Sequence, residues 1–252
     1  MFYLKNSLIQ AIFLIVFFYS FQSQSSNITY IGDSQSAVPY GLFNNLRGAI
    51  PNDQHSFLNS RAVCGANMED YSSQAKRGRC NYPGVTHLSG SNFVESRGST
   101  VLINQLMTNE TDTVIVQLGD NHLGSSEASI RASAQRLARQ ILSSGNSCIW
   151  IGPARANGPS CLERDRQKRQ ASEAISRALA ELEVNGRKCH FINSYTLTNE
   201  NLSTSGDCLH YTSSGYRQWS QAISGRVLAE LNRQSQNRPE GESSSSEAIP
   251  LQ

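Results

Sequence analysis

The sequence predicts an α/β protein built on a parallel sheet that helices cover on both faces. Short apolar runs rich in β-branched and aromatic residues alternate along the chain with segments of helical periodicity. These runs are apolar throughout, which indicates strands buried on both faces. The chain of 252 residues is long enough for one domain with a sizeable core, so a second domain is not needed.

Five segments are predicted strands. Four are clear, because each is short, apolar and followed by Gly or Asn: residues 28–31, 113–118, 148–151 and 189–192. The segment 55–63 is a weaker fifth strand.

Three longer segments have the periodicity of helices that bury one side. Apolar residues from Ile130 to Leu142 form one stripe, which Gly145 ends. A second stripe runs from 174 to 182, and a third runs from 216 to 231.

The two ends of the chain differ in composition from the predicted domain, residues 27–233. Residues 1–26 have a weakly positive start, an apolar run and a small polar end, which is the pattern of a secretory signal. The apolar run is short for a membrane span of ~20 residues, so we expect no stable membrane anchor, although an uncleaved anchor is the alternative. Residues 234–252 are rich in Gln, Ser and Glu and predict a disordered tail. The protein is therefore predicted to be secreted or periplasmic.

An even number of cysteines in an exported chain favours disulfide bonds: Cys64, Cys80, Cys148, Cys161, Cys189 and Cys208. The alternative for Cys148 and Cys189 is a pair of buried thiols in apolar strands. Spacing does not fix the pairing. We expect Cys161 to bond to Cys208, since the loop after the fourth strand should reach the same end of the sheet as Cys208.

Charge and motifs exclude several kinds of protein. A formal net charge of +2 with mixed signs gives no surface for a polyanion, so nucleic acid is not an expected partner. We find no metal-ligand spacing and no phosphate-binding loop, and we expect neither a metal nor a cofactor. The basic stretch Arg164, Arg166, Lys168 and Arg169 is interleaved with acidic residues at helical spacing and predicts a solvated helix face.

Two motifs point to nucleophilic catalysis. Gly32-Asp33-Ser34 closes the first strand, and Asp207-Cys208-Leu209-His210 follows the last. In a parallel sheet both positions fall at the carboxyl ends of the strands, where chemistry gathers. Ser34 is the candidate nucleophile, His210 its general base and Asp207 the group that orients His210. Either motif alone also occurs in ordinary capped turns and surface loops.

Acyl transfer also needs donors for the negative charge that develops on the carbonyl oxygen, each contributing ~3 kcal/mol. The candidates are the backbone N–H groups of Ser34 and Gly65 and the side-chain amide of Asn121. The alternatives for Gly65 and Asn121 are a turn glycine and a turn asparagine.

From about residue 28 to 231, the sequence resembles the SGNH hydrolases, also called the GDSL esterase/lipase superfamily. Residues 31–34 resemble the first block of that family, Gly65 the second, residues 119–121 the third and residues 207–216 the fifth. The resemblance implies a flavodoxin-like three-layer α/β/α fold with a five-stranded parallel sheet of order 2-1-3-4-5. It also implies a serine ester hydrolase without a metal.

Two positions depart from the family pattern. His122 stands where the third block usually has a second carboxylate, and Gln35 follows Ser34 where Leu or His is usual. Neither departure removes a residue of the proposed chemistry. Both therefore concern which substrate the site accepts.

The expected function is that of an exported esterase that removes acetyl or other short acyl groups from a carbohydrate or cell-wall polymer. One alternative is a lipase or lysophospholipase, although no long apolar lid is evident. Others are an acyltransferase and a non-catalytic carbohydrate-binding module on the same fold. The sequence determines neither the substrate nor the oligomeric state.

Overall fold

The computed structural model describes residues 25–76, 78, 84–88, 94–96, 99–199 and 201–237. Most of the predicted signal and of the predicted tail lies outside these residues, as does Cys80.

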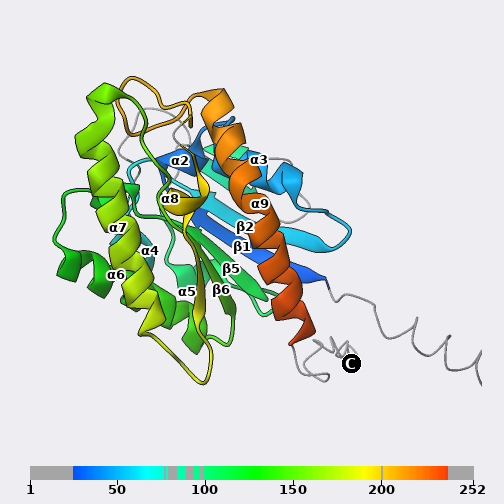
Figure 1. Ribbon diagram of the computed structural model, residues 1–252. Coiled ribbons are helices and arrows are strands. Elements are labelled where there is room, and N and C mark those ends of the chain that lie inside the picture. Colours follow the sequence, from blue (N-terminus) through cyan, green and yellow to red (C-terminus); the bar gives the residue numbers. More distant parts are fainter. Residues whose placement is uncertain are drawn as a thin grey trace, which may run out of the picture.

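One sheet forms the centre of the described structure (Figure 1). Its strands are β1 (Ser26–Gly32), β2 (His55–Ala62), β3 (Gly84–Leu88), β4 (Val94–Ser96), β5 (Thr113–Gln117), β6 (Ser147–Ile151) and β7 (Cys189–Ile192). They lie in the order β4-β3-β2-β1-β5-β6-β7, and the five strands from β2 to β7 are parallel. These five give the order 2-1-3-4-5, so the predicted topology is confirmed.

Two strands were not predicted. β3 and β4 pair antiparallel beyond β2 and extend that edge of the sheet. They are short and lie in a segment rich in Gly and Ser, so no apolar period marks them in the sequence.

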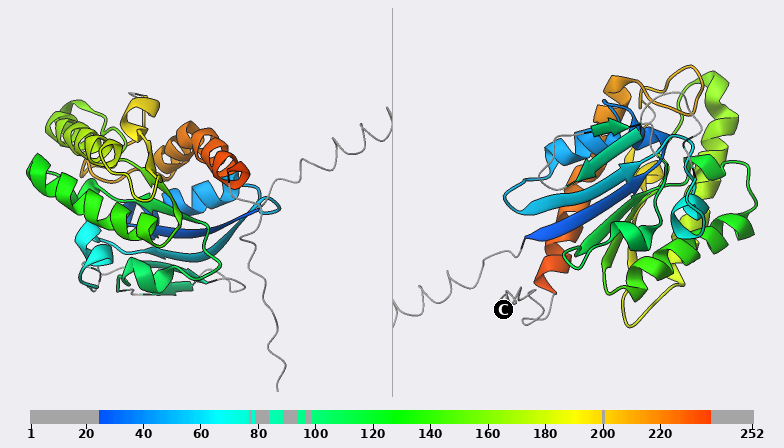
Figure 2. Two further views of the ribbon diagram at one scale, coloured as in Figure 1. Left: turned by 90° about the horizontal axis from the view of Figure 1, so that it is seen from below. Right: turned by 180° about the vertical axis from the view of Figure 1, so that it is seen from behind.

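Helices cover both faces of the sheet (Figures 1 and 2). They are α2 (Ser34–Ala37), α3 (Leu42–Ala49), α4 (Met68–Ser72), α5 (Ile103–Leu106), α6 (Glu127–Ser143), α7 (Leu162–Ala180), α8 (Ser194–Leu197) and α9 (Ser213–Gln236), with 3₁₀ turns η1 (Asp120–His122) and η2 (Pro159–Cys161). The core contains two clusters, one beneath α4 to α7 and one beneath α3 and α9.

Alternate residues of the central strands feed the two clusters. Val114 and Val116 of β5 point into the cluster beneath α4 to α7, whereas Ile115 points into the cluster beneath α3 and α9. The period of two along a strand explains this division, and burial on both faces explains why the strands are apolar throughout.

The predicted boundaries of the domain differ from the observed ones at both ends. β1 begins at Ser26, and α9 continues to Gln236, past the predicted boundary at residue 233. Hydrogen bonds account for this difference. The Ser26 and Ser235 hydroxyls lie 2.6 Å apart, and Thr113 Oγ1 donates to Gln234 Oε1 at 3.1 Å, so these polar side chains are satisfied against the domain.

Within the part of the chain that the structure describes, none of the helices combines the length and apolar character of a membrane span.

Candidate active site

The motif loops meet at the carboxyl ends of the parallel strands, at the upper end of the sheet in Figure 1. Ser34 is the first residue of α2, directly after β1, and His210 lies in the loop that leads into α9. This loop ends in a capped helix, because Thr212 Oγ1 accepts from the Gly215 N–H at 3.1 Å.

A continuous chain of hydrogen bonds joins Ser34, His210 and Asp207. The Ser34 hydroxyl lies 3.0 Å from Nε2 of His210, and Nδ1 of His210 lies 2.6 Å from Oδ2 of Asp207. A carboxylate only accepts, so Nδ1 carries the proton and Nε2 is free to accept from the serine. The three residues therefore have the mutual geometry of a nucleophile, a base and an orienting carboxylate.

Asp207 is held as a charged acceptor. Its Oδ1 accepts from Ser205 Oγ at 2.6 Å, from the Leu209 N–H at 3.0 Å and from the His210 N–H at 2.9 Å. Partial burial raises the pKa of Asp207, but the hydrogen bonds from Ser205 and His210 outweigh it, so the pKa lies well below its ordinary value. Asp207 is therefore ionised near neutral pH.

Ser34 is more enclosed than its position at the end of a strand predicts. Only 2% of its surface is exposed. Its neighbour Asp33 is fully buried and caps α2, accepting from the Gln35 N–H at 2.9 Å. Burial, together with the charge of Asp120, raises the pKa of Asp33 to about 8.

The loops of Gly65 and Asn121 are joined to each other and to β1. Asn121 Nδ2 donates to the Ala66 carbonyl at 2.8 Å, and the Val63 N–H donates to the Gly32 carbonyl at 3.1 Å. Gly65 has φ of 76°, a conformation that favours glycine. One amide hydrogen of Asn121 is thus used to fix the Gly65 loop, and its second hydrogen is left for another acceptor.

His122 follows Asn121 in sequence, but its side chain serves a different purpose. It is 5% exposed, and its Nε2 accepts from the Met68 N–H at 3.3 Å at the start of α4. Burial lowers the pKa of His122, and the charge of Glu69 opposes this effect. The His122 side chain therefore connects η1 to α4.

The predicted bond between Cys161 and Cys208 is confirmed, and it links η2 to the loop of His210. A second bond joins Cys148 to Cys189 across β6 and β7, so the alternative of buried free thiols is wrong. Cys64 is also disulfide-bonded. Cys208 has φ of 57°, which residues other than glycine rarely adopt.

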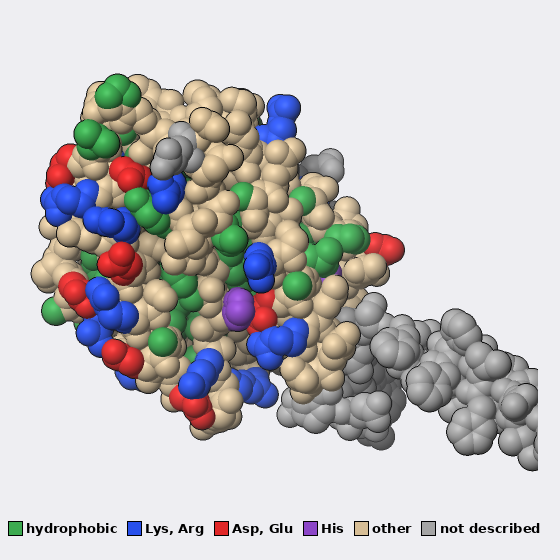
Figure 3. Space-filling model, viewed as in Figure 1, with side chains coloured by type: hydrophobic (Ala, Val, Ile, Leu, Met, Phe, Trp, Pro, Cys, Tyr) green, Lys and Arg blue, Asp and Glu red, His purple; other side chains and the backbone are tan. Residues whose placement is uncertain are grey.

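The prediction of a solvated face on α7 holds for part of the helix. Figure 3 shows Lys and Arg interspersed with Asp and Glu over the side of α6 and α7, and Arg166 pairs there with Glu163. Lys168, however, is 0% exposed, so its assignment to this face is wrong. Lys168 shares the buried side with Ala171 and Ile175, three and seven residues on, and this helical spacing was the available signal in the sequence.

Another residue that sequence reasoning did not assign to the site is Gln35. It is fully buried, and its Nε2 donates to the Leu209 carbonyl at 3.0 Å. Gln35, which departs from the family pattern, thus connects the segment that follows Ser34 to the loop of His210.

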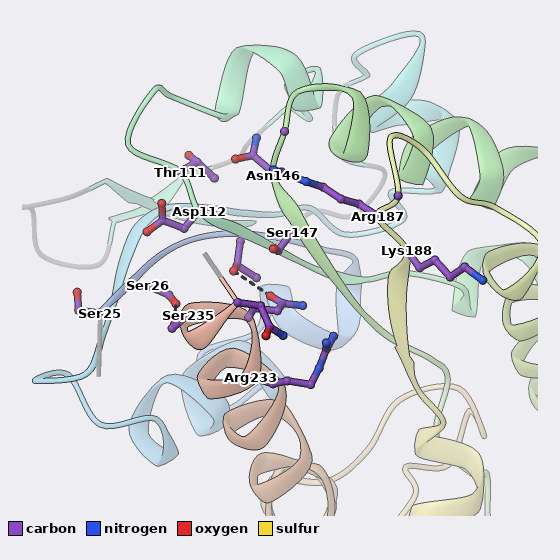
Figure 4. A pocket seen from close by; sticks show the side chains of 15 residues that line it. Ser25, Ser26, Thr111, Asp112, Asn146, Ser147, Arg187, Lys188, Arg233 and Ser235 are labelled. Carbon is purple, nitrogen blue, oxygen red and sulfur yellow. Dashed lines mark hydrogen bonds between the residues drawn. The ribbon is translucent and has the colours of Figure 1, made fainter. Parts of the chain in front are cut away.

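A separate cavity of about 360 Å³ lies at the other end of the parallel strands, away from Ser34 (Figure 4). It is lined by residues at the amino ends of β1, β5 and β6 and by the end of α9, among them Ser26, Thr113, Ser147 and Ser235. Among the described residues, no group of three or more His, Cys, Asp or Glu side chains could hold a metal ion.

The fold is that of the SGNH hydrolases, as three solved structures show. The chain is similar to a family 3 carbohydrate esterase from Clostridium thermocellum, at 15% identity and a TM-score of 0.58 over 84% of this chain and 100% of that one. It is similar to a lipase/acylhydrolase from Enterococcus faecalis, at 16% identity and a TM-score of 0.55 over 81% and 96%. It is also similar to a protein assigned to the SGNH hydrolases from Slackia heliotrinireducens, at 14% identity and a TM-score of 0.54 over 81% and 100%. No protein-family model and no curated protein matches the sequence.

Proposed function

We propose that this protein is an exported serine ester hydrolase that removes acetyl or other short acyl groups from a carbohydrate or cell-wall polymer. The observation that carries the proposal is the hydrogen-bonded chain from the Ser34 hydroxyl through His210 to Asp207.

In the proposed reaction, Ser34 Oγ attacks the ester carbonyl while its proton moves to Nε2 of His210. Asp207 stabilises the imidazolium that forms. The tetrahedral oxyanion accepts hydrogen bonds from the N–H groups of Ser34 and Gly65 and from the free amide hydrogen of Asn121. The carbon–oxygen bond to the alcohol then breaks, and the departing alcohol takes the proton from His210. Water repeats these steps on the acyl-serine and releases the acid.

The enclosure of Ser34 supports a small acyl group. Only 2% of the residue is exposed, and an acetyl group needs less room beside it than a long acyl chain does. A carbohydrate esterase among the similar structures supports a carbohydrate as the alcohol. The similarity to a lipase/acylhydrolase keeps a lipid ester as the second candidate.

Export is supported by the disulfide bonds Cys148–Cys189 and Cys161–Cys208, since such bonds persist in oxidising compartments. The signal itself, residues 1–26, stays a prediction. Sequencing the amino terminus of protein recovered outside the cytoplasm would test it.

The function is tested by presenting purified protein with chromogenic acetyl, butyryl and longer esters, together with acetylated polysaccharide and phospholipid. We expect the acetyl ester and the polysaccharide to be hydrolysed fastest. The Ser34→Ala variant should lose this activity by several orders of magnitude and unfold like the wild type.

Three results would point elsewhere. Preference for long acyl chains would indicate a lipase, and transfer to an added alcohol in place of hydrolysis would indicate an acyltransferase. Equal rates in wild type and Ser34→Ala would refute the serine mechanism.

A further inference from the structure

Lys168 is a fully buried cation whose three hydrogens are all used. Its Nζ donates to Asp120 Oδ1 at 2.5 Å, to the Tyr211 hydroxyl at 3.0 Å and to the Leu209 carbonyl at 3.1 Å. The Tyr211 hydroxyl in turn donates to the Ala154 carbonyl at 3.0 Å, so its oxygen is free to accept. A buried ammonium is costly unless it is paired and fully hydrogen-bonded, and this one is.

The acceptors of Lys168 belong to both halves of the proposed site. Asp120 precedes Asn121 in η1, and Leu209 precedes His210 in the loop before α9. The ammonium group therefore joins the loop that offers an oxyanion donor to the loop that carries the base. These loops come from opposite parts of the sequence, and α7, which carries Lys168, packs against both η1 and β7.

The Leu209 carbonyl has a second donor, which comes from the residue after the nucleophile. Gln35 Nε2 donates to it at 3.0 Å, and the Tyr216 hydroxyl fixes the Gln35 amide by donating to Oε1 at 2.9 Å. Contacts from the loops of Ser34, Asn121 and His210 thus converge on the Lys168 ammonium group and the Leu209 carbonyl.

We propose that Lys168 is a positioning residue that couples the Asn121 loop to the His210 loop, with Gln35 as the second support of the Leu209 carbonyl. Lys168 does not touch the reacting atoms. This inference rests on the proposed function, because it assigns Lys168 a part in the geometry of that same site.

The test separates positioning from simple charge balance. Lys168→Met and Asp120→Asn each leave one buried charge unpaired, so each should shift the midpoint of urea unfolding clearly below that of the wild type. The double variant has no unpaired charge and should recover stability. Its kcat should stay at least about tenfold below the wild-type value, with little change in KM, because misplacing reacting groups by ~1 Å costs up to about 10²-fold.

Arg169→Met is the matched control, since Arg169 is the exposed neighbour of Lys168 on α7. It should keep both the stability and the kcat of the wild type. A double variant that recovers kcat together with stability would overturn the proposal, because charge balance alone would then explain Lys168. Single variants with wild-type kcat would also overturn it.

A second readout needs no ester. The proton shared by His210 and Asp207 should give a low-field NMR signal that disappears in His210→Ala and is retained in Arg169→Met. We expect this signal to be lost or broadened in the double variant, and an unchanged signal would contradict the coupling. If wild-type protein hydrolysed no ester, the proposed function would fail, and this signal would still decide the inference.

A smaller change covers the case in which the three variants do not fold. Tyr211→Phe keeps the aromatic ring and removes only the hydroxyl that accepts from Lys168. A lower kcat with unchanged KM is the expected result, and a wild-type kcat in this variant would then refute the proposal.

Discussion

Deleting each disulfide bond separately should distinguish a bond that only stabilises the fold from one that also supports catalysis. The bonds Cys148–Cys189 and Cys161–Cys208 close loops with sequence separations of 41 and 47 residues. Each bond restricts the entropy of the unfolded chain. Removing either one should therefore lower the free energy of unfolding by about 4 kcal/mol, with a difference of roughly 0.1 kcal/mol between the two bonds. Replacing each pair with Ala therefore gives two variants matched in their expected loss of stability.

The two bonds differ in where they lie. Cys148 and Cys189 pair directly across β6 and β7 near the amino ends of these strands, away from Ser34. Cys208 stands between Asp207 and His210, and its φ of 57° is one that non-glycine residues leave readily when nothing holds them. Without its bond to Cys161 the loop can relax, and displacement of His210 by ~1 Å should lower kcat by about 10- to 100-fold.

The assay combines urea unfolding with steady-state hydrolysis of an acetyl ester at a temperature where both variants are folded. Trp150 and Trp219 are buried and report unfolding by fluorescence. Both variants should lose similar stability, but only Cys161→Ala/Cys208→Ala should lose kcat. Equal losses of kcat in the two variants, or wild-type kcat without the Cys161–Cys208 bond, would refute the reasoning.

Three further predictions concern single residues of the site. Asp207→Asn should lower kcat by about 10⁴-fold by favouring the wrong tautomer of the base, whereas His122→Ala should lower stability and keep kcat; comparable losses of kcat would identify His122 as part of the catalytic unit. Asn121→Ala should lower kcat by about 10²- to 10³-fold, and a change in KM alone would make Asn121 a ground-state contact. Because the pKa of Asp33 is raised to about 8, the folded protein binds more protons than the unfolded chain between about pH 4 and 8. The wild type should therefore lose stability relative to Asp33→Asn as pH rises, by at most ~1.4 kcal/mol per pH unit, and an equal difference at pH 5 and pH 8 in urea titrations would contradict this.

The sequence by itself determined the parallel strands, the principal helices and the two motifs of the proposed site. The strand predicted at 189–192 is β7 as observed. The positions of Ser34 and His210 also follow from sequence, because chain order and strand direction place both motifs at the carboxyl ends of the parallel strands. Asp207 and His210 are three residues apart, so a single loop suffices to bring them together.

Only the tertiary structure decided what surrounds these residues. The enclosure of Ser34, the burial of Lys168 and the contact from Gln35 to Leu209 depend on which loops pack together, and the residues involved lie far apart in sequence. Local periodicity reports which side of an element is apolar, but it does not report which polar groups meet at the end of a sheet. A charged residue such as Lys168 can therefore be buried wherever packing supplies enough acceptors, and no local pattern of charges reveals whether those acceptors are present.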